Sequence, residues 1–394
     1  ARWHQERLSA FGGSLPYRQF WKTLDGIAET FWRVCRRGAS LPIRRPRQLI
    51  EGICAIGASD LGKTRYLHWS LGDLLRRHRL ESDLRLRALL GMLVEDTVHG
   101  KVDTAPLINA ALGITIRGAG LTRARGGMAG FWKLFLDRYR ELGGVLVHRC
   151  RVKEVQRAGL DYVVRTTRGE VRAQQVVSAL PAELTRGIGP PPVRDRLTDH
   201  VERNRSCVGG AVVVFLGVPE HEVADTEWTH HQLLHDYAAP LGMGNNMFLS
   251  VSSPNDELSA PPGHRAVMIS THCELDPWED LDAEAYRRSK REAQERLIGL
   301  ARRVYPNLGR DAVVCETGTP RTYRRFVGRP RGAVGGYRQS LANSNLRAIP
   351  HDLGVPGFHL VGDTTWPGLG TVACVLGSRV VASNVMRSAR VGPA

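Results

Sequence analysis

Cysteine, lysine and long apolar runs are all scarce in this sequence of 394 residues. The seven cysteines are odd in number and never spaced as C-x-x-C, which argues against a disulfide framework or a zinc knuckle. The longest nearly uninterrupted apolar run, residues 207–218, is shorter than the roughly 20 residues that a membrane-spanning helix needs. Residues 1–8 lack the apolar core of a signal peptide. We therefore expect a cytoplasmic protein with no metal site and no spanning helix.

Because lysine occurs only six times, arginine carries most of the formal net charge of +16. The excess is concentrated in residues 1–50, which hold ten arginine or lysine residues against three acidic ones. A basic face of this kind attracts anionic lipid headgroups or nucleic acid. No helix-turn-helix, zinc-finger or RNP-like aromatic signature accompanies the charge. We therefore expect an anionic membrane surface as a partner and no nucleic acid, while the oligomeric state stays open.

The length predicts two lobes, and the first hundred residues have mostly helical patterns. Helices are expected at 17–37, around 67–80 and at 84–98, with Pro42 and Pro46 ending the first pattern. The apolar face of the first helix contains Phe20, Trp21, Phe31 and Trp32. Such an aromatic stripe commonly packs in a core, and docking on a membrane surface is the alternative.

The rest of the chain alternates between strand and helix patterns. Strands are expected at 145–148, 152–155, 162–166, 176–179, 207–217, 246–252, 265–272, 312–317 and 358–361. Helices are expected at 126–142, 283–304 and 371–386.

The most informative segment is the strand 358–361, the glycine-rich turn 362–370 and the helix that follows. This order brings free main-chain N–H groups and the positive end of a helix dipole to one place, which suits an anion or an electron-rich ring. Glycines let the backbone approach a flat ring closely, and Asp363 is suited to accept a hydrogen bond from a sugar-like hydroxyl. A plain strand-to-helix turn capped by Asp363 is the alternative.

Residues 361–373, VGDTTWPGLGTVA, resemble the final flavin-binding motif of the FAD-dependent carotenoid desaturase and isomerase (phytoene desaturase-like) family, within the flavin amine oxidase superfamily. APLINA at 105–110, RGGM at 125–128 and ETGTPRTYRRF at 316–326 resemble the same family in the same order. The resemblance implies FAD as cofactor. The residues it assigns to the cofactor are Val152 and Ala179 near the dinucleotide, and Gly362, Asp363, Gly370, Thr371 and Val372 at the flavin-facing turn.

The resemblance also implies a fold of α/β and α+β class. It consists of an incomplete Rossmann-like FAD-binding domain plus a substrate domain with an antiparallel sheet and a helical insert. The expected domains are 1–124 (mostly helical, facing substrate or membrane), 125–190 (part of the FAD-binding domain), 191–345 (substrate domain) and 346–394 (carboxy-terminal part of the FAD-binding domain). The G-x-G-x-x-G turn with which the family begins does not occur here, so we expect this sequence to be a piece of a longer protein.

The activity implied by the resemblance is desaturation or cis–trans isomerisation of a long apolar polyene. Flavin oxidation of amines or porphyrinogens and a flavin-free, non-catalytic remnant are the alternatives. No catalytic base can be assigned, although Glu316 is a candidate beside a plain surface role.

Two further patterns concern nucleotide and metal binding. Residues 57–64 match the P-loop pattern G-x-x-x-x-G-K-T, which makes a nucleotide-binding protein another alternative. The preceding apolar stretch, residues 53–56, is short for the required strand, and Asp60 would place a negative charge in the phosphate cradle. The histidines at 230, 231 and 235 lack a nearby carboxylate or cysteine, so they predict a solvated loop.

Overall fold

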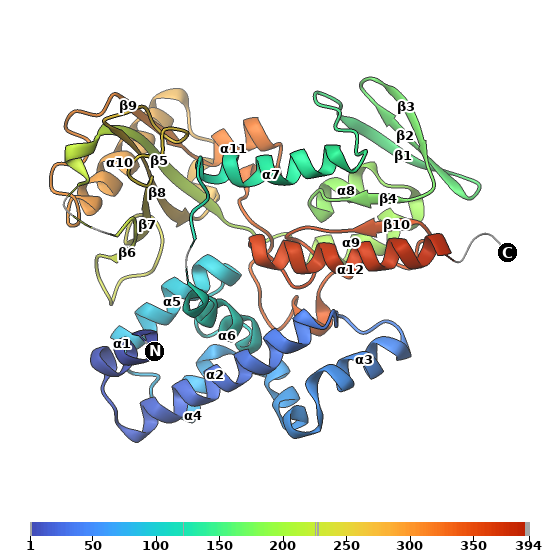
Figure 1. The fold of residues 1–394 in the computed structure, drawn as a ribbon, viewed down its shortest axis with the longest axis horizontal. Helices are drawn as coiled ribbons and strands as arrows, with labels where there is room; N and C mark the ends of the chain where they lie inside the picture. Colours follow the sequence, from blue (N-terminus) through green and yellow to red (C-terminus); the bar gives the residue numbers. More distant parts are fainter. Residues whose placement is uncertain (1, 121, 225, 227, 391–394) are drawn as a thin grey trace. The chain divides into compact units, whose positions relative to one another are not determined.

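The structure is a computed structural model that describes residues 2–120, 122–224, 226 and 228–390 (Figure 1). The chain forms two compact units, each assembled from separate stretches of sequence. Unit 1 comprises residues 1–120, 149–208 and 335–394, and unit 2 comprises residues 121–148 and 209–334. The four-part domain division expected from the sequence stays a prediction.

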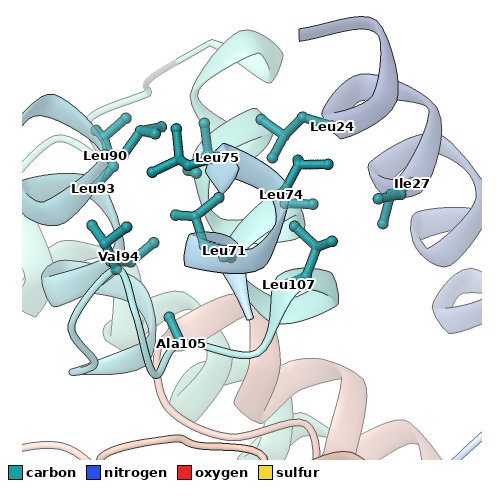
Figure 2. Packing of buried hydrophobic residues seen from close by; sticks show 14 of the residues in the cluster. Leu24, Ile27, Leu71, Leu74, Leu75, Leu90, Leu93, Val94, Ala105 and Leu107 are labelled. Carbon is teal, nitrogen blue, oxygen red and sulfur yellow. The ribbon is translucent and has the colours of Figure 1, made fainter. Parts of the chain in front are cut away.

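The amino-terminal part of unit 1 is helical. Its elements are α1 (Arg2–Phe11), α2 (Leu15–Arg36), α3 (Pro46–Ile56), η1 (Ala58–His68), α4 (Leu71–Arg77), α5 (Leu84–Val98), α6 (Leu107–Thr115) and η2 (Ile116–Ala119). Fully buried leucines from four of these helices, Leu24, Leu71, Leu90 and Leu107, pack in one core (Figure 2). The helix expected around 67–80 is shorter than predicted, because Ser70 caps α4 by accepting a hydrogen bond from the Asp73 N–H.

The aromatic residues of α2 belong to this core. Phe20 is 0% exposed, Trp21 3% and Phe31 7%. The Arg7 guanidinium lies 4.6 Å from the centroid of the Trp21 ring and hydrogen-bonds Asp25 through both amino nitrogens. The hypothesis that this aromatic stripe docks on a membrane is therefore wrong for Phe20, Trp21 and Phe31, which pack in the core, while Trp32 is half-buried against it.

Helix α3 is an element that the sequence patterns did not predict. Pro46 is its first residue, where a proline needs no N–H partner and already has a helical φ. The Gln48 side chain accepts hydrogen bonds from the N–H groups of Arg44, at 2.7 Å, and Arg45, at 2.9 Å. Pro46 therefore begins a helix instead of only ending the preceding one.

The remainder of unit 1 is mixed. Strands β1 (Val152–Ala158), β2 (Asp161–Thr166) and β3 (Gly169–Ala173) form an antiparallel sheet, and β4 (Val176–Ser178) pairs in parallel with β10 (Phe358–Leu360). Helices α8 (Ala182–Ile188), α9 (Pro191–Arg203) and α12 (Thr371–Arg390) complete this part (Figure 1). Tyr162 and Phe358 are buried between these elements, with ring centroids 5.9 Å apart.

Unit 2 is built on a five-stranded antiparallel sheet with the order β6-β7-β8-β5-β9. The strands are β5 (Gly210–Pro219), β6 (His230–Leu234), β7 (Asn246–Val251), β8 (His264–Cys273) and β9 (Val314–Gly318). The helical segments are α7 (Gly127–Glu141), η3 (Glu220–Glu222), η4 (Asp276–Trp278), α10 (Ala283–Ala301), α11 (Pro320–Val327) and η5 (Pro330–Gly332). A core of valine, isoleucine and leucine side chains joins the sheet to α10.

Two sequence expectations in unit 2 are wrong. Residues 145–148 form no strand, because the turn after α7 leads into irregular chain in which Val145 is 78% exposed. The expected histidine loop is instead strand β6, where His230 and His231 pair with Ser250 and Leu249 of β7. Within the described residues, no helix is both long enough and apolar enough to cross a membrane.

Candidate functional site

The site is built around the short parallel pair of strands in unit 1. The chain leaves β10 through Val361, whose N–H donates to the Ser178 carbonyl of β4 at 2.9 Å. Gly362 follows with a φ of +117°, and a Cβ at this position would lie 3.4 Å from the Ala179 carbonyl oxygen. The structure therefore brings together Ala179 and Gly362, two of the residues expected to contact the cofactor.

The turn between Gly362 and α12 is held by its own hydroxyl groups. The Thr365 hydroxyl donates to the Gly362 carbonyl at 2.7 Å, and the Ala182 N–H donates to the Thr364 hydroxyl at 3.2 Å. Asp363 lies half-buried within this turn. These contacts fix the path of the chain between the strand pair and the last helix.

Helix α12 begins at Thr371 with free donors. The first hydrogen bond to the turn runs from the Cys374 N–H to the Gly370 carbonyl at 3.0 Å. The N–H groups of the first helical residues have no acceptor inside a helix and carry the positive end of its dipole. A Cβ added to Gly370, which has a φ of +94°, would meet no atom within 4 Å, so the turn faces open space.

That open space is an apolar cavity of about 410 Å³ in unit 1. Gly370, Thr371 and Val372, three of the predicted flavin-facing residues, lie in its wall. The opposite walls come from helices α2, α3, α5 and α6 and are made mainly of aliphatic and aromatic side chains. Val152, at the start of β1, packs half-buried against another cluster and does not line this cavity.

A chain of amide groups crosses the cavity wall. The Asn345 side-chain amide donates to the side-chain oxygen Oδ1 of Asn109 at 2.8 Å. The Asn109 side-chain amide donates to the side-chain oxygen Oε1 of Gln339, also at 2.8 Å. The Gln339 amide donates in turn to the Pro367 carbonyl at 3.0 Å. All three side chains are buried. This series of hydrogen-bonded amides therefore fixes the turn before Gly370 from the far wall of the cavity.

Among the described residues, the groups lining the cavity that can ionise are Cys35 and Asp96. Burial raises the pKa of the Cys35 thiol to about 12, so this sulfur stays protonated at neutral pH and is a poor nucleophile. Asp96 is half-buried at the end of α5 and is the carboxylate among the described lining residues. Glu316, the base candidate named from the sequence, lies exposed on β9 of unit 2.

The P-loop alternative fails on the local fold. The matching residues follow helix α3 and form the 3-10 helix η1, where a P-loop needs a preceding strand and a following α-helix. The Lys63 ammonium is engaged by the Thr30 hydroxyl and by Asp60, each at 2.9 Å. Asp60 also pairs with Arg33, so its carboxylate holds both cations and puts a negative charge where a P-loop would bind phosphate.

The histidines of unit 2 are engaged by neighbouring side chains. His230 lies 3.3 Å from an Arg123 amino nitrogen, and His231 lies 3.1 Å from the Tyr305 hydroxyl. Each ring is therefore part of the packing of β6.

The first turn of α12 fits a flat, electron-accepting ring such as that of FAD. Gly370 leaves room for close approach, the first N–H groups of α12 offer donors, and the cavity around them is apolar. Gly370, Thr371 and Val372 are the residues that would hold such a ring through their main chain. Asn109, Gln339 and Asn345, which support this turn, were not recognised from the sequence.

The chain is similar in sequence to a known family and to named proteins. The family profile described as Flavin containing amine oxidoreductase matches residues 73–386. The chloroplastic prolycopene isomerase of Daucus carota is 25% identical over 328 residues, which cover 81% of this chain and 53% of the relative. That of Arabidopsis thaliana is 26% identical over 333 residues, covering 81% of this chain and 54% of the relative. The chain thus spans about half the length of the curated relatives it matches.

The chain is also similar to solved structures. A wild-type putrescine oxidase bound to putrescine aligns with a TM-score of 0.57 at 13% identity, covering 95% of this chain and 76% of that one. Cyclohexylamine oxidase from Brevibacterium oxydans IH-35A aligns with a TM-score of 0.55 at 14% identity, covering 94% of this chain and 76% of that one. At such identities the likeness concerns the fold alone, and it confirms the predicted α/β and α+β class.

Proposed function

Because the chain belongs to the Flavin containing amine oxidoreductase family, we propose that it serves an FAD-dependent enzyme whose substrate is a long apolar polyene. Family membership confirms FAD as the predicted cofactor. The observation that carries the substrate class is the apolar cavity of about 410 Å³, whose wall includes the first turn of α12. Binding sites of this size and apolarity suit a ligand held by burial with few polar anchors.

The proposed reaction is cis–trans isomerisation of the polyene, with desaturation as the other reaction open to the same site. Relatives named prolycopene isomerase support isomerisation. The flavin, when bound, supplies the exchange of electrons that this chemistry needs. The chain's own contribution is positioning. The α12 N–H groups favour negative charge on a ring beside them, and the apolar walls exclude water and align an extended hydrocarbon.

The amine alternative is less well supported by the cavity. A cationic amine needs carboxylates or a polar surface to replace its hydration, whereas the described lining residues are mostly aliphatic and aromatic and include Asp96 as a carboxylate. The cytoplasmic location and a membrane partner remain part of the proposal.

The test uses the full-length protein purified without added cofactor. We expect the visible absorbance bands of oxidised flavin, and conversion of prolycopene in detergent micelles to an isomer of unchanged mass. A product lighter by two hydrogens would identify desaturation. A colourless protein that also fails to take up added FAD, or hydrogen peroxide release with putrescine but no change in the polyene, would overturn the proposal.

A matched pair of variants ties the activity to the cavity. Val372→Trp fills space beside the first turn of α12, and we expect it to abolish polyene conversion. Val375→Trp makes the same change on the same helix at a residue that is similarly exposed, 45% against 43% for Val372, and that does not line the cavity. We expect this control to retain activity. The flavin absorbance of both variants separates a filled cavity from lost FAD, because Val372 also belongs to the turn that would hold the ring. Equal activity of the two variants would argue against the cavity as the substrate site.

A further inference from the structure

Helix α3 presents an apolar stripe to solvent. Leu49 is 47% exposed, Ile50 62% and Ile53 46%, and these residues share one face at the helical spacing of three and four. Ile43, before the helix, and Leu61, in η1 after it, are each 39% exposed. We call these five residues, Ile43, Leu49, Ile50, Ile53 and Leu61, the α3 lip.

The α3 lip is continuous with the inside of the cavity. Four of its members line the cavity and are exposed at the same time, so the apolar surface runs from the cavity wall to the outside of unit 1. The fifth, Ile50, is the most exposed and does not line the cavity. The lip therefore marks a mouth of the cavity, and Ile50 extends the apolar surface beyond it.

Positive charge flanks the lip. Residues 36–65 contain seven arginine or lysine residues against two acidic ones, Glu51 and Asp60. Glu51 pairs with Arg47, and Asp60 pairs with Arg33 and Lys63. Arg45 pairs with Asp352. Among the described residues, the other arginines of this segment lack a carboxylate partner: Arg36, Arg37, Arg44 and Arg65.

We propose that the α3 lip docks on the surface of an anionic lipid bilayer, so that the mouth of the cavity opens against lipid. The inference rests on the proposed function in taking the substrate to be a polyene, which dissolves in the bilayer and not in water. An amphipathic helix with aliphatic side chains and flanking arginines is the combination that binds this interface. Docking would cover side chains that α3 otherwise leaves in water and give the substrate an apolar path to the cavity.

The test is flotation of the full protein with vesicles, compared between phosphatidylcholine alone and phosphatidylcholine with phosphatidylglycerol. We expect binding to the anionic vesicles that weakens as salt is raised. Ile50→Glu should weaken it about tenfold or more, because a carboxylate replaces an apolar side chain that docking would bury. Leu160→Glu, at a 75% exposed leucine in the turn between β1 and β2, should bind as the unaltered protein does.

Arginine variants test the role of charge. We expect Arg36→Gln with Arg44→Gln to weaken binding to anionic vesicles and to leave the weaker binding to neutral vesicles unchanged. Arg168→Gln with Arg172→Gln, at two exposed residues of the β2–β3 hairpin, is the control for loss of two charges. Equal flotation with both kinds of vesicle would overturn the electrostatic part of the proposal.

A fluorescent label on Cys54 gives a readout of where the bilayer lies. Cys54 is an exposed residue of α3, and Cys315 is an exposed residue of β9 in unit 2. With anionic vesicles we expect the emission of a polarity-sensitive label to shift to the blue at Cys54 and not at Cys315. A protein that does not float, an Ile50→Glu variant that floats normally, or a second copy of the chain found covering Ile50 would each overturn the proposal.

Turnover separates this inference from the proposed function. Ile50→Glu should convert polyene in detergent micelles at the normal rate and lose conversion when the polyene is supplied in vesicles. A different outcome is that the unaltered protein floats with anionic vesicles and shows the blue shift at Cys54 while converting no polyene, whether from micelles or from vesicles. In that case docking stands and the proposed function fails.

Discussion

Replacing Asn109 with alanine would test whether the buried amide chain supports the candidate site. Asn109 accepts from Asn345 and donates to Gln339, each at 2.8 Å, and is only 9% exposed. The substitution leaves the Asn345 amide and the Gln339 carbonyl oxygen without these partners. Each unsatisfied buried group costs about 1–3 kcal/mol, so the free energy of unfolding should fall by at least about 2 kcal/mol.

The functional effect of this substitution should follow from the same contacts. Gln339 holds the Pro367 carbonyl, and the chain continues from Pro367 into Gly370 and the first turn of α12. Once Gln339 loses its partner, we expect that turn to be held less firmly and FAD affinity to fall along with stability.

The assay is urea unfolding of four proteins: unaltered, Asn109→Ala, Gln339→Ala and the double variant. If the two side chains act through one hydrogen bond, the double variant should be less destabilised than the sum of the single variants. FAD titration of the same proteins follows the effect on the site. Strict additivity would refute the reasoning because the two side chains would then not be coupled. A loss below about 1 kcal/mol for Asn109→Ala would refute it because neither unpaired group would then be costly.

Three further predictions concern individual side chains. Hydrogen bonds from Lys63 and Arg33 lower the pKa of Asp60 to about 2, so its stabilising effect is present above the unfolded pKa of about 4 and is lost as pH falls toward 2. Chemical denaturation should show Asp60→Asn less stable than the unaltered protein at pH 7. The difference in their free energies of unfolding should shrink as pH falls from about 4 toward 2, and a difference that stays constant would contradict this. Phe20→Ala should lower the free energy of unfolding measured in urea by about 3–5 kcal/mol and leave vesicle flotation unchanged. If the folded variant no longer floats with vesicles, the aromatic face of α2 takes part in membrane binding after all. Thr371→Pro removes one N–H donor at a helix position that tolerates proline, so FAD titration should show affinity about three- to tenfold weaker. Thr371→Val keeps the N–H and should bind FAD almost normally. Equal FAD affinities of the two variants would count against a role for the Thr371 N–H.

The sequence predicted most elements whose pattern is local. The apolar spacing of residues 17–37 predicted α2, and the strand, glycine turn and helix near the carboxyl end predicted β10 and α12. Helix α3 was missed because Pro46 was taken only to end a helix, although proline also begins helices. Strand β6 was missed because its histidines gave no alternating apolar pattern.

The candidate site divides in the same way. Gly370, Thr371 and Val372 are consecutive, and their turn carries its own signal, so their place in a cavity wall was predictable. The amide chain joins Asn109 to residues more than 200 positions later, and no local pattern indicates which asparagine meets which glutamine. The exposure of Ile50 depends equally on how η1 and α2 pack around α3, which hydrophobic periodicity alone does not determine.

The interleaved path of unit 1 has a consequence for synthesis on the ribosome. Unit 2 is encoded within residues 121–334, so its whole sheet has been synthesised before the last stretch of the chain is made. Unit 1 must wait for residues 335–394, which bring β10 to the edge of β4 and supply one wall of the cavity. During translation the early helices therefore have to persist with an unfinished apolar surface, a stage at which a nascent chain is most in need of a chaperone.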